Sequence, residues 1–264
     1  MISLQHKRIW ITGASSGIGK ALALAMAPEK PHLILSGRQA ERLQAVAEQC
    51  QGLGAEVEME LFDLESPSET EASAAKVLAG GKVDILVNNA GRSQRSLIHE
   101  TKMEVYERLI QLDFLANIRL TKALLNSWIA EGGGQVVVIS SLVGKFSTPY
   151  RSGYAAAKHA LHGFYDALRA EQKHHNVKVT MICPGFIRTA VSINSFTGDG
   201  GKLNDMDRAQ KKGMDPDLFA RKALRAIKAE KAEVYIGGKE KAGVYLSRYL
   251  PNLFRKMLPK VKVR

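Results

Sequence analysis

The chain has few cysteines and no long apolar run. Its 264 residues include two cysteines, Cys50 and Cys183, and neither lies in a pattern with the spacing of metal ligands. This excludes a disulfide-rich secreted scaffold and predicts two reduced, buried thiols. No apolar run reaches the roughly 20 residues that a membrane-spanning helix needs. The first predicted strand begins near Arg8, which leaves no room for a signal peptide. We therefore expect a cytoplasmic protein.

Linkers, repeats and aromatic clusters are also absent. No Ser/Gly/Pro-rich stretch or internal repeat divides the chain. This predicts one domain over residues 1–240, followed by a C-terminal extension over residues 241–264. Aromatic residues make up 6% of the chain, and no stacking series or recognition motif accompanies the net charge of +12. We therefore expect no nucleic-acid partner.

Short segments rich in Val and Ile alternate with longer helical patterns. The predicted strands cover residues 8–12, 32–36, 56–62, 84–88, 135–140, 178–183 and 233–236. The longest predicted helices cover residues 40–51, 103–130 and 152–174. This alternation predicts an α/β fold with a doubly wound, Rossmann-type parallel sheet that helices cover on both faces. In such a sheet, ligands bind beyond the carboxyl ends of the strands.

The first predicted strand runs into a glycine-rich turn. Gly13, Gly17 and Gly19 follow this strand and precede an Ala/Leu-rich helical segment. Glycines let the backbone approach a phosphate, and the new helix offers its N–H groups and dipole to a pyrophosphate. The spacing differs from the G-x-G-x-x-G of many dinucleotide folds, so a plain strand-to-helix turn is the alternative.

A serine, a tyrosine and a lysine form the second candidate site. Tyr154 and Lys158 stand four residues apart, and Ser141 lies thirteen residues before the tyrosine. In a helix, this spacing places the phenol and the ammonium on one face. A nearby cation lowers the pKa of a phenol from about 10 toward the range where it can act as an acid or base. Taken alone, the pair is more typical of an ordinary core tyrosine and a solvated lysine, and only the rest of the chain favours the catalytic interpretation.

Four motifs in register resemble the single-domain short-chain dehydrogenase/reductase family. They are the glycine segment 12–19, the segment Asn88-Asn-Ala-Gly91, the set Ser141, Tyr154 and Lys158, and Pro184-Gly185 with Thr189. The resemblance covers residues 7–238, and segments 151–161 and 182–185 resemble the member 7 and 7B group. It implies a strand order of 3-2-1-4-5-6-7, and association into homodimers or homotetramers through the helices 103–130 and 152–174.

The resemblance also implies the chemistry. Hydride passes between a nicotinamide and a carbonyl or alcohol carbon, Tyr154 exchanges the proton, and Ser141 stabilises the developing alkoxide. Lys158 lowers the pKa of Tyr154 and binds the nicotinamide ribose. Asp63 holds the adenine or, alternatively, caps a helix, and Thr189 bonds the carboxamide. The expected cofactor-binding residues are Gly13, Ser15, Ser16, Gly17, Ile18, Gly19, Arg38, Asp63, Leu64, Asn89, Ala90, Gly91, Tyr154, Lys158, Pro184, Gly185, Ile187 and Thr189.

Two positions bear on cofactor choice and on proton transfer. Sites selective for NAD carry an acid after the second strand, whereas here Gly37 and then Arg38 follow it. A guanidinium can bind a 2′-phosphate, so we expect NADP(H) to be preferred over NAD(H). Asp113 occupies a position where the family often has asparagine. Because an ionised carboxylate cannot donate a hydrogen bond, we expect Asp113 to alter the proton relay from Lys158 or its pH dependence.

The positive charge is concentrated in the last part of the chain. Residues 219–264 hold thirteen Lys/Arg and three Glu, a net charge of +10, against +2 in the remainder. Between the cations runs an apolar stripe with helical spacing, comprising Leu246, Tyr249, Leu250, Leu253, Phe254, Met257, Leu258 and Val261. Such a stripe could lie on an anionic membrane surface, which would make the protein membrane-associated, or cover the substrate cleft or a subunit partner.

Substrate identity is the least readable property. The glycine-containing segment 190–216 corresponds to a mobile lid in the family, and the resemblance and the tail favour an apolar steroid, retinoid or lipid-like carbonyl or alcohol. A non-catalytic NADP-binding sensor is the alternative, although such proteins often lack the tyrosine or the lysine. A sugar-nucleotide epimerase or dehydratase would usually have a longer C-terminal domain and another glycine spacing.

Overall fold

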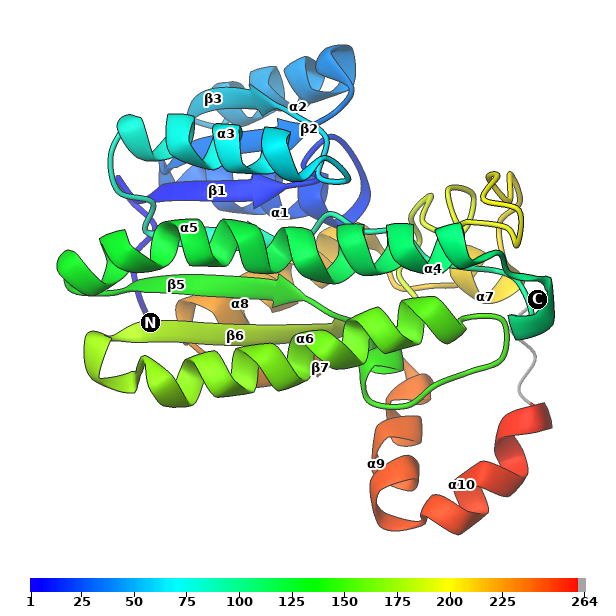
Figure 1. The fold of residues 1–264 in the computed structure, drawn as a ribbon. Coiled ribbons are helices and arrows are strands. Elements are labelled where there is room, and N and C mark those ends of the chain that lie inside the picture. The colour runs from blue at the N-terminus through cyan, green and yellow to red at the C-terminus, as the bar shows by residue number, and fades with distance from the viewer. Residues whose placement is uncertain (261–264) are drawn as a thin grey trace.

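Seven parallel strands form one sheet. The computed structural model describes residues 1–260, and the sheet has the order β3-β2-β1-β4-β5-β6-β7 (Figure 1). The strands are β1 (Arg8–Thr12), β2 (His32–Gly37), β3 (Glu56–Leu61), β4 (Ile85–Asn88), β5 (Gly134–Ile139), β6 (Val177–Pro184) and β7 (Glu233–Ile236). The predicted fold class and strand order are confirmed.

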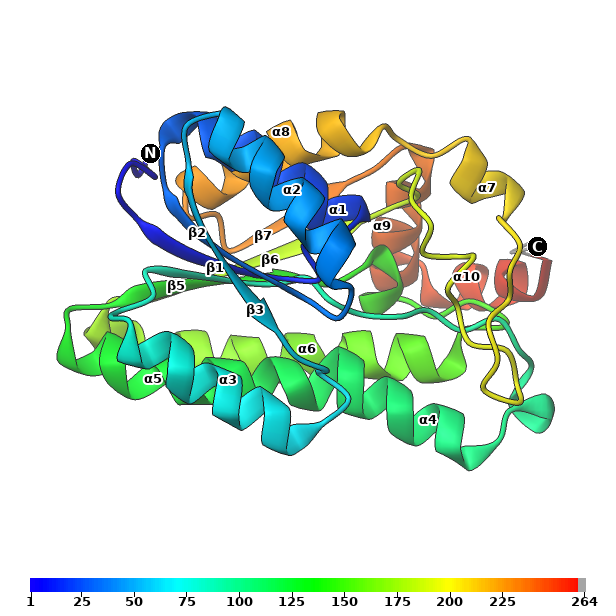
Figure 2. The same cartoon turned by 90° about the horizontal axis from the view of Figure 1, so that it is seen from above.

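Helices cover both faces of the sheet because the central strands are apolar on both faces. In β1, Ile9 and Ile11 pack toward one layer of helices, whereas Trp10 packs toward the other. Figure 2 shows the two layers edge-on. The first layer consists of α1 (Gly17–Met26), α2 (Ala40–Gly52) and α8 (Pro216–Lys228). The second consists of α3 (Pro67–Ala79), α5 (Ala116–Ala130) and α6 (Ser152–Glu171).

The predicted helix over residues 103–130 contains an irregular turn. It consists of α4 (Met103–Ile110) and α5, joined by a π-helical turn at Gln111–Leu115. The buried side chain of Asp113 lies in this turn. Wide turns of this kind occur mostly inside helices and frequently at functional sites.

The remaining helices lie beyond the carboxyl ends of the strands. They are α7 (Arg208–Lys211), α9 (Ala242–Tyr249) and α10 (Pro251–Met257), and the last two form a bent arm at the end of the described chain (Figure 1). Pro251 starts α10, where its missing N–H leaves no intrahelical bond unmade. Within residues 1–260, no helix combines the length and the apolar character that crossing a bilayer requires.

Candidate active site

The predicted site residues lie at the carboxyl edge of the sheet. Asn88 ends β4, Ser141 follows β5 by two residues, and Pro184 ends β6. Ser141 caps the 3-10 turn Leu142–Gly144, since its hydroxyl oxygen accepts a hydrogen bond from the Val143 N–H at 3.1 Å. The parallel strands thus bring together residues that are far apart in sequence.

Helix α6 carries Tyr154 and Lys158 on one face. The Lys158 Nζ lies 5.7 Å from the centroid of the Tyr154 ring, as the four-residue spacing predicts. Lys158 is only 3% exposed, and its ammonium donates to the main-chain oxygen of Ile139 at 3.1 Å. The lysine is therefore a buried cation beside a phenol and not a solvated surface residue.

Asp113 faces this cation from the π-helical turn. Its Oδ1 lies 3.6 Å from Lys158 Nζ and accepts the N–H of Arg92 at 3.1 Å. The carboxyl is fully buried, and burial raises its pKa to about 6, although Lys158 and the Arg92 N–H act in the opposite direction. Oδ2 has no hydrogen-bond partner within the described residues. A Cβ on Gly91 would collide with Oδ1, so glycine is required at that position.

A polar cavity of about 280 Å³ adjoins the glycine turn. Of the predicted cofactor-binding residues, it is lined by Gly13, Ser15, Ser16, Ile18, Arg38, Asp63, Leu64, Asn89, Ala90, Gly91 and Thr189. Gly13 and Gly17 adopt positive φ angles of 64° and 56°, which favour glycine. A Cβ on Gly19 would collide with the main-chain oxygen of Gly13. The turn therefore needs these glycines, although Gly17 and Gly19 do not line the cavity themselves.

The donors around this cavity suit a phosphorylated dinucleotide. The Ser16 side chain makes no capping hydrogen bond at the start of α1, so the first-turn N–H groups are left for a ligand. Arg38, Arg42 and Lys202 line the same cavity, and the last two were not predicted from the sequence. Arg38 Nη1 lies 3.1 Å from Asp63 Oδ2 and 3.6 Å from Glu65 Oε1, so this cation is shared with two carboxylates.

A second cavity, of about 100 Å³, connects the cofactor side to the candidate catalytic residues. The predicted residues along it are Ile18, Asn89, Gly91, Asp113, Ser141, Tyr154, Lys158, Pro184, Gly185 and Ile187. Thr189 lines the cavity of about 280 Å³, and its Oγ1 lies 3.5 Å from Gln210 Nε2. Together, the two adjoining cavities are lined by all of the site residues expected from the sequence except Gly17 and Gly19.

A third cavity, of about 710 Å³, is mainly apolar. Ser141 and Tyr154 line one end of it, and α9 and α10 form much of its wall. The stripe residues that line it are Leu246, Tyr249, Leu250, Phe254, Met257 and Leu258. Within the described residues, most of the stripe thus lines this cavity, which agrees with one of the three roles considered for it. Val261, Lys262 and Arg264 of the tail lie outside the described residues.

Charged residues that the sequence did not single out lie at the catalytic end of this cavity. Arg95 and Arg151 line it, and both approach Asp207, with nitrogen–oxygen distances of 2.5 Å and 3.7 Å. Burial lowers the pKa of Arg151 to about 10, with Arg95 acting in the same direction. No local pattern predicts this cluster, because Asp207 is more than fifty residues from either arginine.

Comparison with known proteins identifies the family. The sequence pattern of the short chain dehydrogenase family matches residues 7–199. The chain is 39% identical to dehydrogenase/reductase SDR family member 7B from Xenopus laevis, covering 95% of this chain and 80% of the relative. It is 34% identical to dehydrogenase/reductase SDR family protein 7-like from Drosophila melanogaster, covering 99% of this chain and 82% of the relative.

Solved structures agree with this result. A short-chain dehydrogenase from Streptomyces avermitilis superposes with a TM-score of 0.81 at 29% identity, over 95% of this chain and 94% of the other. An alcohol dehydrogenase from Thermococcus sibiricus, solved with 5-hydroxy-NADP, gives a TM-score of 0.73 at 29% identity, over 88% and 97% of the chains. On the sequence match and the shared fold, this chain belongs to the short-chain dehydrogenase family, and is an oxidoreductase of that family.

Proposed function

We propose that the protein catalyses NADP(H)-dependent hydride transfer to or from the carbonyl or alcohol carbon of an apolar, steroid-, retinoid- or lipid-like molecule. One observation carries this proposal. Ser141 and Tyr154 line both the cavity of about 100 Å³, which adjoins the proposed cofactor cavity, and the apolar cavity of about 710 Å³. Their hydroxyls can therefore meet a substrate oxygen at the junction of the cofactor and substrate sides.

The proposed mechanism assigns each side chain one task. The nicotinamide, when bound, supplies or accepts the hydride. In reduction, Tyr154 donates its proton to the developing alkoxide, and the Ser141 hydroxyl hydrogen-bonds the same oxygen. The buried Lys158 ammonium, 5.7 Å from the centroid of the Tyr154 ring, would stabilise negative charge that develops beside it during proton transfer, and Asp113 partly offsets the ammonium charge. The enzyme would exclude water from this region because Asp113 and Lys158 are both buried.

Selectivity for NADP(H) is supported by the cationic cavity. No carboxylate stands at Gly37, and Arg38, Arg42 and Lys202 line the cavity of about 280 Å³. Arginine binds phosphate oxygens through paired N–H donors, so the two arginines suit a 2′-phosphate. The structural relative from Thermococcus sibiricus was solved with an NADP derivative.

Substrate access would involve the segment 190–216, the proposed lid. Val191 from this segment lines the apolar cavity. Phe196 is buried, and its ring centroid lies 4.8 Å from Arg92 Cζ and 4.5 Å from Arg108 Cζ. These cation-π contacts attach the lid to α4 and to the loop after β4.

The decisive test compares wild type with Tyr154→Phe. Oxidation of NADPH and NADH is followed by absorbance against cyclic ketones, long-chain aldehydes and retinal. The variant should lose turnover by about 10²–10⁴-fold, the usual contribution of a general acid, and still bind NADPH. Tyr106→Phe is the matched control. The Tyr106 hydroxyl lies 3.0 Å from Ser152 Oγ, within hydrogen-bond distance, and Tyr106 lines none of the three cavities. Retained turnover in Tyr154→Phe would refute the mechanism, whereas tight NADPH binding without turnover on any carbonyl would favour the sensor.

Two kinds of partner complete the proposal. The arm formed by α9 and α10 exposes Arg248, Arg255, Lys256 and Lys260, which suit a peripheral contact with an anionic membrane. Subunits would associate as homodimers or homotetramers through α4, α5 and α6, where Leu115 and Ile129 are each 36% exposed. Sedimentation equilibrium tests the association, and a monomer at micromolar concentration would contradict it.

A further inference from the structure

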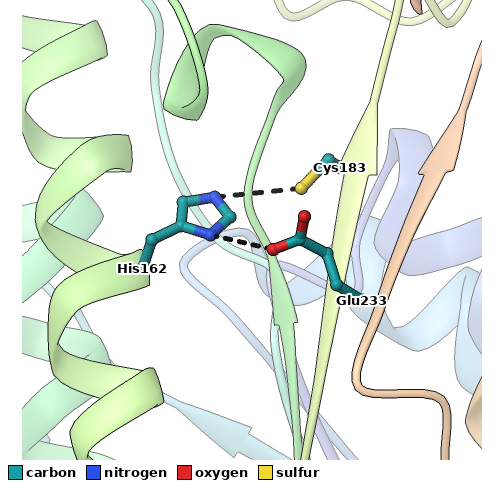
Figure 3. Close-up of side chains that lie close together, drawn as sticks. All are labelled: His162, Cys183 and Glu233. Carbon is teal, nitrogen blue, oxygen red and sulfur yellow. Dashed lines mark hydrogen bonds and ion pairs between the residues drawn. The ribbon is translucent and has the colours of Figure 1, made fainter. Parts of the chain in front are cut away.

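A buried polar cluster lies next to the candidate catalytic residues without belonging to them. His162 is one helical turn beyond Lys158 on α6 and is only 8% exposed. Its Nε2 lies 3.0 Å from Ser140 Oγ and 3.8 Å from Cys183 Sγ, whereas its Nδ1 lies 3.3 Å from Glu233 Oε2 (Figure 3). The imidazole therefore bridges β5 and β6 on one side and β7 on the other.

Glu233 holds the second half of the cluster together. Its Oε2 lies 2.6 Å from Lys145 Nζ, and its Oε1 accepts the hydroxyl of Tyr235. Burial raises the pKa of Glu233, but the neighbouring His162, Lys145 and Tyr235 side chains outweigh it and lower the pKa to about 2. The carboxylate is thus ionised at neutral pH and binds three side chains from three elements.

The same residues do not form a metal site. A histidine, a cysteine and a glutamate within 4.8 Å are typical zinc ligands. However, Cys183 and Glu233 face different nitrogens of the imidazole, so the three donors do not converge on one point (Figure 3). Burial and the Glu233 charge raise the pKa of Cys183 to about 12, which keeps it a thiol. The Lys145 ammonium already occupies the carboxylate.

The cluster is connected to Ser141 at both ends of one short turn. Ser140, which contacts His162, directly precedes Ser141 in the sequence. Lys145, which pairs with Glu233, caps the 3-10 turn that Ser141 begins. Between them, a Cβ on Gly144 would come within 2.7 Å of Ser140 Oγ and 3.0 Å of His162 Nε2. The turn that carries Ser141 is therefore packed tightly and tied at its start and its end.

Aromatic contacts connect the same cluster to the arm of α9 and α10. Tyr235, which donates to Glu233, packs edge-on against Tyr245 of α9 with ring centroids 6.2 Å apart. Phe146, the neighbour of Lys145, packs in the same way against Phe254 of α10 at 5.4 Å. Glu233 therefore contacts both Tyr235, which packs on α9, and Lys145, which ends the turn that carries Ser141.

We propose that His162 and Glu233 are positioning residues that fix Ser141 relative to α6 and tie that position to the α9–α10 arm. The inference rests on the proposed role of Ser141 in catalysis. A substrate that fills the apolar cavity would contact Tyr245 and Phe254 of the arm. These two rings pack against Tyr235 and Phe146, which are next to Glu233 and Lys145 of the cluster. Binding of the apolar part of the substrate would thereby help to hold the Ser141 hydroxyl against the reacting oxygen.

The kinetic test uses Glu233→Gln, His162→Ala and the double variant. Each single variant should lower kcat by about tenfold to a hundredfold, because a small displacement of a catalytic group has an effect of this size. The Kd for NADPH should stay within about twofold of wild type, and the double variant should be no slower than either single one, since the two residues act as a unit.

Two further variants separate positioning from simple loss of structure. His162→Gln keeps a hydrogen-bonding group beside Ser140 and should recover part of the lost kcat. Glu29→Gln removes a carboxylate whose Oε1 lies 2.7 Å from Lys228 Nζ. Neither residue lines any of the three cavities, so this control should leave kcat unchanged. An unchanged kcat in Glu233→Gln and His162→Ala, or an equal loss of NADPH binding in both, would overturn the inference.

A second measurement needs no turnover. Trypsin can cut the exposed arm after Arg248, Arg255 and Lys256, and mass spectrometry gives the rate at each position. In Glu233→Gln these cuts should be roughly tenfold faster than in wild type, because the arm loses its attachment, and in Glu29→Gln they should be unchanged. Equal rates in all three proteins would refute the link. Faster cutting in a protein that reduces no carbonyl would support the link and refute the proposed function.

Zinc titration separates the positioning role from the metal alternative. With Zn²⁺ as the probe, wild type and Cys183→Ser should bind equally weakly, and added Zn²⁺ should leave the melting temperature of each protein unchanged. Stoichiometric binding at micromolar Zn²⁺ that is lost in Cys183→Ser would establish a metal site and overturn the positioning role.

Discussion

At the scale of single residues, the Lys158–Asp113 pair is the main departure from the pattern that the sequence resembles. Asp113 shares a buried region with Lys158, and the distance of 3.6 Å is longer than a hydrogen bond. The carboxyl therefore modulates the charge of Lys158 without fully neutralising it. Sequence alone predicts an altered relay at Asp113, but not the raised pKa, because that depends on burial of the π-helical turn against Lys158 and the loop of Gly91 and Arg92.

Substitution of Asp113 should change how stability depends on pH. Burial raises its pKa from 3.8 to about 6. The folded protein therefore holds this proton more tightly than the unfolded chain, so the stability contribution is full below about 3.8 and is lost as the pH rises through about 6. Between about pH 4.5 and 7, the wild type should lose about 2 kcal/mol of unfolding free energy relative to Asp113→Asn.

Urea unfolding at several pH values measures this difference. Asp166→Asn is the control, because Asp166 is an exposed residue in an ion pair with Arg169 on α6. A wild type that gains stability over Asp113→Asn as the pH rises would contradict the raised pKa. A parallel change in Asp166→Asn would show that the effect is not specific to the buried carboxyl.

Arg38 should control the choice between the two cofactors. Replacing it with alanine removes the cation proposed to bind the 2′-phosphate and leaves Asp63 and Glu65 without that partner, so both effects would disfavour a 2′-phosphate. We expect kcat/KM for NADPH to fall about tenfold to a hundredfold, as for the loss of a hydrogen bond to a charged group, with a much smaller change for NADH. Arg221→Ala on the exposed side of α8 is the control. A wild type that prefers NADH would refute the assignment directly.

At the scale of elements, sequence patterns predict the strands and helices whose apolar residues are buried locally, but not the features that depend on tertiary packing. The strands follow from short apolar runs, and all five residues of β1 are buried. The π-helical turn at Gln111–Leu115 cannot be predicted from local sequence. Its buried residue Asp113 contacts Lys158, which is forty-five residues away in the sequence, so the turn depends on tertiary packing. Spacing correctly predicts an apolar stripe in the tail. It does not tell which surface the stripe covers, since that depends on how α9 and α10 pack.

Helix α10 offers a matched pair of substitutions. Phe254 lines the apolar cavity and packs on Phe146, whereas its neighbour Leu253 is 48% exposed and does not line the cavity. Phe254→Ala should raise KM for an apolar carbonyl about tenfold, since burial of such a side chain is worth roughly 1.5–3 kcal/mol. The Kd for NADPH should not change, and Leu253→Ala should leave both constants near wild type in vesicle-free buffer. Equal effects of the two substitutions would show that α10 does not line the substrate site as proposed.

At the scale of the whole molecule, charge and apolar surface are distributed unequally. Residues 219–264 carry +10 of the net +12, and this segment includes the arm that lines the apolar cavity proposed for the substrate. The arm also exposes large apolar side chains, with Tyr249 75% and Leu250 54% exposed. An apolar surface among cations next to a substrate cavity suits an enzyme whose substrate lies in a membrane.

Vesicle binding should therefore depend on both charge and apolar contact. The wild type should co-sediment with vesicles that contain phosphatidylserine, and much less with neutral ones. Arg255→Glu with Lys256→Glu should weaken binding by roughly 2 kcal/mol or more, since each Lys or Arg near an anionic surface contributes about 1 kcal/mol. High salt should weaken wild-type binding because it screens exposed charges.

Leu253→Ala should weaken vesicle binding at low salt and at high salt, because it removes an apolar contact. This effect on lipid binding separates the role of Leu253 from that of Phe254, which lines the apolar cavity. Arg221→Glu with Lys222→Glu on α8 changes the net charge equally and is the control. If this control weakens binding as much as the α10 pair, then overall charge attracts the protein and the arm is not the contact; if deletion of residues 241–264 leaves binding unchanged, the membrane proposal is wrong.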